Sequence, residues 1–185
     1  LPRIAQTDVG VAGVGTAAAL RAALKQDCDV VMVSRVADNE VAQIATAAAA
    51  RGVLVLAGTK DASVFSAPDI SIHTAVLRRL GGKQIADKHK LTRVQTDQLE
   101  ESANFARVLS VLKEEGKVAK DTPWKDLQFV RPTPNTEHQD GYDGLIGVQE
   151  VMREGVVVGL NLIEDALFKA AQGLTSIEEV KKLIV

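Results

Sequence analysis

Residues 26–57 read QDCDVVMVSRVADNEVAQIATAAAARGVLVLA, and this stretch decides the fold class of the chain. Two runs without a charged residue, at 30–33 and 53–57, have the length and composition of buried strands. The Ala-rich segment between them follows Asp38, a favourable N-cap residue, and ends at Gly52, a favourable helix stop. A strand, a helix and a strand in this order predict a βαβ unit. Its two strands should be parallel and covered by other elements on both faces.

The segments before and after this unit are predicted from composition and turn residues. Residues 16–25 form a helix rich in Ala and Leu. After residue 57 we expect a loop, then a short helix at 70–80 that stops at two glycines. Charge is dense from 83 to 120, with helical stretches near 96–105 and 106–115, and three prolines interrupt 121–138.

The C-terminal region is predicted as one strand followed by helices. Residues 145–151 form the strand, and 152–172 are expected to be helical. In that helix Leu167 and its neighbours at helical spacing should face a core, whereas Glu164 and Lys169 should point outward. Thr175 is the predicted cap of a last helix, with Glu178 in the capping-box position. The chain therefore divides near residue 82 into an α/β part and a mostly helical part that contains an irregular insertion.

Composition excludes several classes of protein and site. A formal net charge of -2 gives no global attraction to nucleic acid or to anionic lipid. The single Cys28 excludes an internal disulfide and a zinc cage built on several cysteines. No apolar run approaches the roughly 18 residues that a membrane span needs. We therefore expect a soluble, cytoplasmic chain without nucleic-acid binding or membrane insertion.

Polar residues follow both predicted strands. Ser34 and Arg35 come after the first strand and Lys60 after the second, and α/β proteins usually build their sites at the ends of adjacent parallel strands. With Asp38 they form the candidate nucleotide-binding residues, in which the cations Arg35 and Lys60 would hold phosphate. The competing interpretation is that they are solvated loop charges. A nucleotide hydrolase places an acid at this strand end to orient water or Mg²⁺, and Arg35 is instead a cation that repels the metal.

Residues 13–18, GVGTAA, match the form G-x-G-x-x-A at the start of a helix. Such glycines let a dinucleotide pyrophosphate approach a helix N-terminus, provided that a hydrophobic strand comes directly before them. The preceding VGVA is a poor strand, which favours a plain turn into a helix. A small-molecule-binding α/β protein that uses this turn remains an alternative function.

Six segments resemble the type II secretion and type IV pilus assembly ATPase family, in the order in which they occur there, one of them through Asp38, Glu40, Ala42, Ile44 and Ala45. Residues 26–38 are similar to the family's second acidic motif. The other four are LPRIAQTDVG at 1–10, TAAALRAAL at 16–24, GYDGLIGVQE at 141–150 and EDALFKAAQGLTSIEEV at 164–180. The last is the most specific match. The resemblance covers the chain from end to end.

The resemblance implies a fold and a division of the chain. It implies the C-terminal part of a RecA-like P-loop ATPase core, with a mostly helical C-terminal region and a zinc-less insertion. Residues 1–82 would be the partial core, 83–140 the insertion equivalent to the family's metal-binding subdomain, and 141–185 the C-terminal strand and helices. In the insertion, Pro134 and Glu137 stand where the family has cysteines, so no metal site is expected.

This sequence departs from the family at the positions that carry catalysis. Ser34 and Arg35 replace the family's Gly-Glu, and no G-x-x-x-x-G-K-[ST] phosphate loop is present. Residues 52–62 correspond to a family segment that carries a functional His; Val53 replaces the first His of that segment, and the second is missing. We therefore expect no catalytic residues and a degenerate, non-hydrolysing module with a structural or regulatory role. The alternative is a fragment of an active motor whose phosphate loop lies upstream.

ATP and Mg²⁺ are implied by the family alone, and no cofactor is expected on this chain by itself. The implied partners are pilus or secretion assembly proteins, with homo- or hetero-oligomers. They would hold a cytoplasmic protein at the inner face of the membrane.

Overall fold

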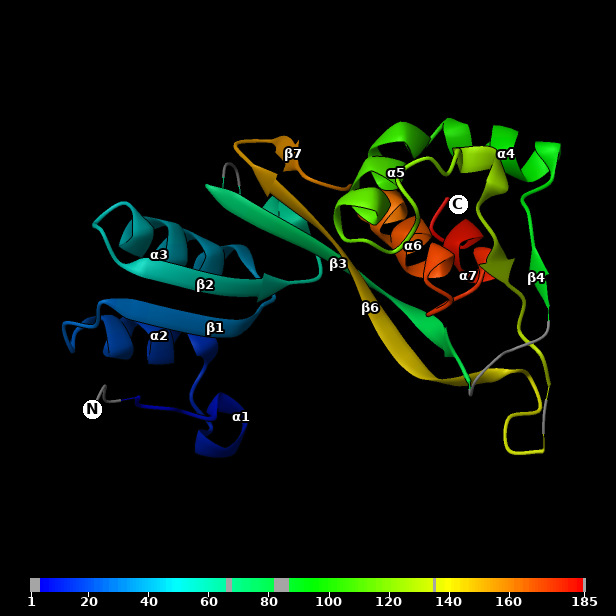
Figure 1. Ribbon diagram of the computed structural model, residues 1–185. Coiled ribbons are helices and arrows are strands. Elements are labelled where there is room, and N and C mark those ends of the chain that lie inside the picture. The colour runs from blue at the N-terminus through cyan, green and yellow to red at the C-terminus, as the bar shows by residue number, and fades with distance from the viewer. Residues whose placement is uncertain (1–3, 66–67, 82–86, 135, 185) are drawn as a thin grey trace. The chain divides into compact units, whose positions relative to one another are not determined.

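The computed structural model describes residues 4–65, 68–81, 87–134 and 136–184 (Figure 1). The chain divides into two compact units, residues 1–68 (unit 1) and 69–185 (unit 2), which are described one at a time. The sequence placed a division near residue 82. The structure joins residues 69–81 to unit 2 because they form a strand that pairs within it.

Unit 1 contains the predicted βαβ arrangement (Figure 1). Its two strands pair in parallel, with Val30 opposite Leu54 and Val33 opposite Ala57. The helix between them begins after Asp38, whose side chain accepts a hydrogen bond from the Val41 N–H at 2.9 Å, as expected for its N-cap. The elements are α1 (Val9–Ala12), α2 (Thr16–Leu24), β1 (Val30–Val36), α3 (Asn39–Ala49), β2 (Leu54–Thr59) and η1 (Ala62–Val64).

Within unit 1, helices cover one face of the β1–β2 sheet. Val31 and Val33 are buried against Leu20 of α2 and Val41 of α3. The opposite face carries large apolar side chains that are each at least half exposed: Val30, Met32, Leu54 and Leu56. Within unit 1 the expectation of helices on both faces is therefore wrong, because α2 and α3 pack on the same face.

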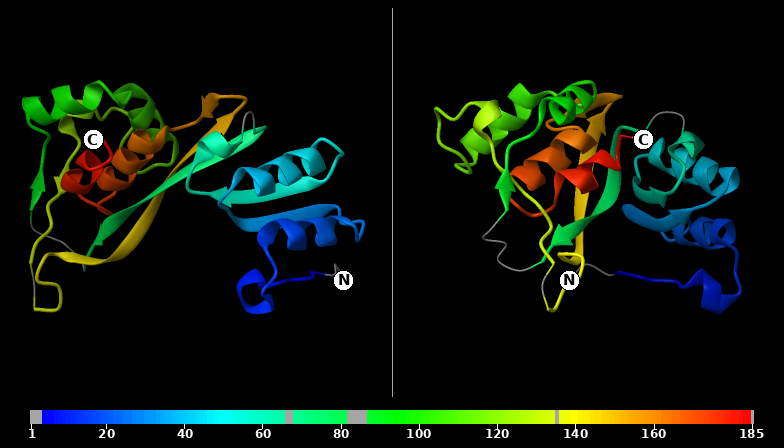
Figure 2. Two further views of the ribbon diagram at one scale, coloured as in Figure 1. Left: turned by 180° about the vertical axis from the view of Figure 1, so that it is seen from behind. Right: turned by 90° about the vertical axis from the view of Figure 1, so that its right-hand side faces the viewer.

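Unit 2 is built on an antiparallel sheet of order β3-β6-β7, with helices on one side of it (Figures 1 and 2). Its strands are β3 (Ile70–Leu80), β6 (Tyr142–Arg153) and β7 (Val156–Val158), and a separate pair joins β4 (Lys88–His89) to β5 (Phe129–Val130). Its helices are α4 (Arg93–Glu100), α5 (Phe105–Glu114), η2 (Trp124–Asp126), α6 (Leu162–Ala171) and α7 (Ile177–Lys181).

The core of unit 2 lies between the sheet and the helices. Leu77 of β3 and Val148 of β6 are at most 2% exposed and pack in one cluster with α5, α6 and α7. Leu167 is fully buried there, as the helical spacing predicted. The sheet's other face carries the exposed side chains Ile70, Ile72, Val76, Leu145, Val156 and Val158.

The prediction of a helix over 70–80 is wrong, because this segment is strand β3. It pairs with β6 from Ile70 opposite Arg153 to Leu80 opposite Tyr142. The β-branched side chains of this segment recur at every second position and share one face, which is the strand period rather than the helix period.

The prediction of a helix over 152–172 is wrong in its first half. The strand predicted at 145–151 is confirmed, but it extends to Arg153 and returns as β7. Glu154 and Gly155, with φ of 51° and 78°, form the two-residue turn between them. Left-handed conformation at both turn residues matches the right-handed twist of a tight hairpin. The helix begins only at Leu162.

Two side-chain predictions near the C-terminus are corrected. Glu164 does not point outward but is 1% exposed, because its carboxylate accepts from the Asn161 and Asn104 N–H groups, both at 2.9 Å. The cap of α7 is Ser176, which accepts from the Glu179 N–H, rather than Thr175.

Candidate functional site

The candidate nucleotide-binding residues lie at one edge of the β1–β2 sheet. Ser34 and Arg35 lie within β1 near its carboxyl end, because this strand extends to Val36 rather than ending at Val33, and Lys60 directly follows β2. The strands are parallel, so their carboxyl ends share an edge. The register between them is irregular from Val33 to Val36, and this irregularity contains Ser34 and Arg35. The topology thus brings Ser34, Arg35 and Lys60 to the same end of the sheet.

Gly58 is the residue that lets the two strands approach at this point. A Cβ at position 58 would lie 2.5 Å from the Ser34 carbonyl oxygen. Carbon and oxygen do not approach so closely without displacement of the backbone, so only glycine fits beside the irregular part of β1. Sequence reasoning missed this role because it depends on the pairing register.

Arg35 and Lys60 give this edge a positive character. Both side chains are exposed, and neither forms an ion pair with any residue that the structure describes. Two cations without a counter-ion attract an anion such as phosphate, with a strength that falls as salt rises. They repel a divalent cation.

The acidic side chains nearest in sequence to this edge already accept hydrogen bonds from other residues. Asp38 caps α3. Asp61 accepts from the Ser63 hydroxyl at 2.7 Å and from the Ser63 N–H at 2.9 Å, and these hydrogen bonds hold the pKa of Asp61 below its ordinary value. Because Asp38 caps a helix and Asp61 binds Ser63, neither carboxylate takes the role of the acid at a strand end. The residues present suit a phosphate group but do not suit Mg²⁺, which prefers oxygen ligands.

The turn at Gly13 lacks the context of a dinucleotide site. Gly13 has a φ of 63°, and α2 begins three residues later at Thr16. The residues before it, VGVA, form the short helix α1 rather than a strand. A glycine turn that follows a helix does not provide the strand-to-helix geometry that a pyrophosphate needs.

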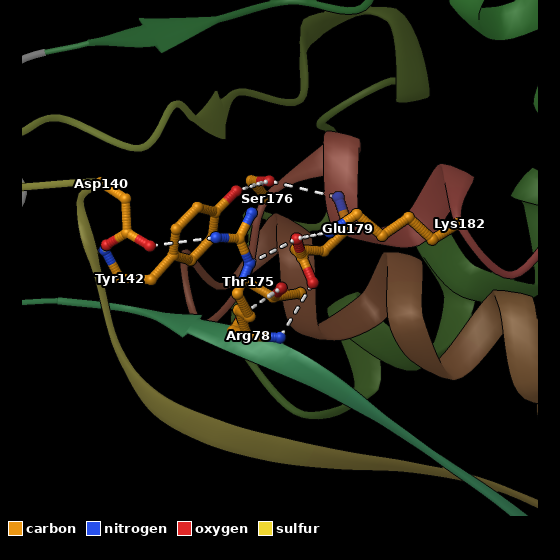
Figure 3. Close-up of polar contacts among 7 residues, drawn as sticks. All are labelled: Arg78, Asp140, Tyr142, Thr175, Ser176, Glu179 and Lys182. Carbon is orange, nitrogen blue, oxygen red and sulfur yellow. Dashed lines mark hydrogen bonds and ion pairs between the residues drawn. The ribbon is translucent and has the colours of Figure 1, made fainter.

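A second polar cluster connects the C-terminal helix of unit 2 to its sheet (Figure 3). Glu179 of α7 is 3% exposed and accepts from the backbone N–H of Arg78 at 3.0 Å and from its Nε at 2.9 Å. Lys182 also donates to Glu179. Burial alone would raise the pKa of Glu179, but the hydrogen bonds from Lys182 and Arg78 outweigh it and lower the pKa.

Tyr142 completes this cluster. Its hydroxyl is 2.8 Å from the Ser176 hydroxyl, and the Arg78 guanidinium lies 3.9 Å from the centre of its ring (Figure 3). Thr175 donates to the Arg78 carbonyl at 2.7 Å, and Arg78 also pairs with Asp140 at 3.0 Å. The GYDG and TSIEE segments singled out in the sequence therefore meet, and their polar residues fasten α7 to β3.

The comparisons with known proteins cover both units. The model of the type II/IV secretion system protein family matches residues 1–182. The chain belongs to this family. The family match includes the strand-end edge of unit 1 and the Arg78 cluster of unit 2. The resemblance seen in the sequence is thereby confirmed.

Three relatives are each named type IV pilus assembly ATPase PilB. The protein from Acinetobacter baylyi is 27% identical over 198 aligned positions, which cover 92% of this chain and 33% of the relative. The protein from Thermus thermophilus is 30% identical, covering 97% of this chain and 23% of the relative. The protein from Pseudomonas aeruginosa is 29% identical, covering 92% and 34%. The family member described here thus spans about a quarter to a third of the length of these relatives.

Within residues 4–65, 68–81, 87–134 and 136–184, no three His, Cys, Asp or Glu side chains gather in a way that could hold a metal ion. In the same ranges, no helix combines the length and the apolar character needed to cross a bilayer.

Proposed function

We propose that this chain is a non-hydrolysing module of a pilus assembly or secretion machine, with a structural or regulatory role. The observation that carries the proposal is Arg35. It lies at the carboxyl end of β1 beside the end of β2, where a nucleotide hydrolase of this topology needs an acid. A guanidinium does not take a proton from water as a carboxylate does, and it repels the metal that phosphoryl transfer uses.

The proposed fold is the C-terminal part of a RecA-like core. A parallel pair flanked by helices on one face, with an apolar second face, supports this assignment, because parallel sheets are normally covered on both faces and extended by further strands. In this proposal, residues 83–140 replace the zinc-binding subdomain, and 141–185 carry the C-terminal strand and helices. The partners are pilus or secretion assembly proteins, in a homo- or hetero-oligomer at the cytoplasmic side of the membrane.

A second candidate function is a segment of an active ATP-hydrolysing motor. The lengths of the relatives favour it, since each extends well beyond the region matched by this chain. In that case a phosphate loop in another segment would supply the missing contacts to ATP, and Arg35 and Lys60 would act on phosphate from the far side of the site.

Phosphate release from ATP by the 185-residue chain tests the proposal. We expect no release above background, and none after Arg35→Glu, because a restored acid still lacks a loop that positions the phosphates. Arg51→Glu is the matched control, since Arg51 is an exposed cation in the same unit that precedes the amino end of β2, opposite the carboxyl ends of the strands. EDTA-sensitive release by the wild-type chain would contradict the proposal.

The two candidates separate when the matched regions are exchanged. Residues 1–182 can replace the equivalent region of the Thermus thermophilus relative, whose own activity serves as the reference. The proposal expects an inactive chimera that Arg35→Glu reactivates at least in part. An active chimera with Arg35 intact would favour the motor segment.

A further inference from the structure

A small pocket opens in unit 2 between α4, η2 and β5. Its volume is about 230 Å³. Apolar side chains form its floor: Leu91, Trp124, Leu127 and Phe129. Leu127 and Phe129 are 5% and 1% exposed, so the floor is part of the core rather than a mobile surface.

The aromatic floor is held rigidly. The Trp124 ring stacks on Phe105 with the ring centres 4.3 Å apart and an interplanar angle of 10°. Its centre lies 6.2 Å from that of Phe129, at 60°. The start of α4 is fixed by a capping box between Thr92 and Gln95. A pocket that exists before binding avoids the entropy cost of ordering its walls.

Two cationic side chains lie at the rim of the pocket. Arg93 is the first residue of α4 and Lys125 lies in η2; both line the pocket and both are exposed. Neither forms an ion pair with a residue in the described part of the chain, whereas the neighbouring Lys90 is paired with Asp126 at 2.7 Å. Asp97 is the acid among the lining residues. The rim is therefore positive, on a chain whose overall net charge is -2.

We propose that this pocket binds a peptide segment of a partner protein that carries one bulky apolar side chain flanked by carboxylates. The apolar side chain occupies the Trp124 floor, and the carboxylates pair with Arg93 and Lys125. The volume suits one side chain, because pockets for drug-sized molecules measure roughly 300–1,000 Å³.

The surface next to the pocket favours an extended peptide over an isolated small molecule. Asp97 also lines an open recess of about 550 Å³, together with Gln98, Glu101, Lys181 and Ile184. The pocket and the recess thus adjoin across α4, and a chain segment anchored in the pocket can continue along the recess. This proposal is independent of ATP hydrolysis at the β1–β2 edge.

Trp124 provides the readout, since it is the single tryptophan of the chain. The probes are two acetylated, amidated pentapeptides with a central phenylalanine, flanked on each side by two glutamates or by two lysines. N-acetylphenylalanine represents a free small molecule with the same ring and one carboxylate. Each is titrated into the 185-residue chain at low salt while Trp124 fluorescence is recorded.

We expect a saturable change with the acidic peptide and at least about tenfold weaker binding of the basic peptide. Arg93→Glu combined with Lys125→Glu should reverse this preference. Lys120→Glu, at an exposed lysine that does not line the pocket, should leave it unchanged. The Arg93 change places an acid at a helix N-terminus, which favours the helix. Gain of binding to the basic peptide shows that the double variant is folded, which a simple loss of binding would not.

Three results would overturn the proposal. The first is equal affinity for the acidic and basic peptides, or no saturable change with either. The second is binding of N-acetylphenylalanine as tight as that of the acidic peptide, which would indicate a small-molecule pocket. The third is a wild-type oligomer that the double variant dissociates, because the occupant would then be a second copy of this chain.

Discussion

Removing the Glu179 carboxylate should destabilise unit 2 because three donors converge on it. Glu179→Ala leaves the Arg78 backbone N–H without its acceptor at a site that is almost fully buried. An unsatisfied buried donor costs about 1–3 kcal/mol, and breaking a buried charge pair costs about 3–5 kcal/mol. The Arg78 side chain is 42% exposed and keeps Asp140 as a partner, which lowers the second figure. We expect a loss of roughly 2–4 kcal/mol in the free energy of unfolding.

Urea unfolding followed by Trp124 fluorescence measures this loss, since Trp124 lies in unit 2. Glu178→Ala is the matched control: Glu178 is the neighbouring acid in the first turn of α7, but it is exposed. Glu178→Ala should lower the free energy of unfolding only by the interaction of this acid with the helix dipole, about 0.3–1 kcal/mol. Equal losses for the two variants, within about 0.5 kcal/mol, would refute the reasoning that burial and shared donors make Glu179 important.

The same cluster predicts a pH dependence with a definite sign. The pKa of Glu179 is lower in the folded protein than its ordinary value. Its contribution is therefore complete above the unfolded-state pKa of about 4.3 and is lost as pH falls through the folded-state pKa. Glu179→Gln, which has no carboxylate to protonate, should lose less stability than the wild type as the pH falls below about 4.3. A parallel loss in both proteins would contradict this assignment.

Other predictions test packing, the strand edge and the insertion. Leu167→Ala should cost about 2–5 kcal/mol in urea melts because Leu167 is fully buried, whereas Leu145→Ala, at a side chain 68% exposed, should cost less than about 1 kcal/mol. Gly58→Ala should destabilise unit 1 by roughly 1–3 kcal/mol, measured by circular dichroism, because its Cβ meets the Ser34 carbonyl; Gly147→Ala, with open space at its Cβ, is the control. Elemental analysis after dialysis should find well under one zinc per chain, and a chelator should leave the melting temperature unchanged. A stoichiometric metal would overturn the alignment of the insertion.

The βαβ unit could be predicted because its signals are local. Two uncharged strands, an N-cap and a helix-ending glycine lie within residues 26–57. The structure confirms the parallel strand pair and the N-cap Asp38, and α3 ends at Ala49, shortly before Gly52. Strand β3 could not be assigned in this way, because its partner β6 lies more than 60 residues away and Leu and Arg near its end also suit a helix. Pairing with β6 decides the outcome.

The candidate sites show the same division between local and distant signals. Parallel topology was sufficient to bring Ser34, Arg35 and Lys60 to one edge. The close approach at Gly58 depends on a register irregularity that composition does not reveal. Arg78 and Glu179 lie 101 positions apart, so their pairing, and with it the burial of Glu179, emerges only when α7 packs on β3.

Charges that flank the exposed apolar face of unit 1 also bear on the colloidal behaviour of the chain. Short uncharged runs of β-forming residues, such as 30–33 and 53–57, are the kind of segment that stacks between copies into aggregates. Arg35 and Lys60 follow these runs and act as gatekeepers, since like charges repel when two copies align in register. A chain with both residues neutral would lose this protection and precipitate at concentrations where the wild-type chain stays dispersed.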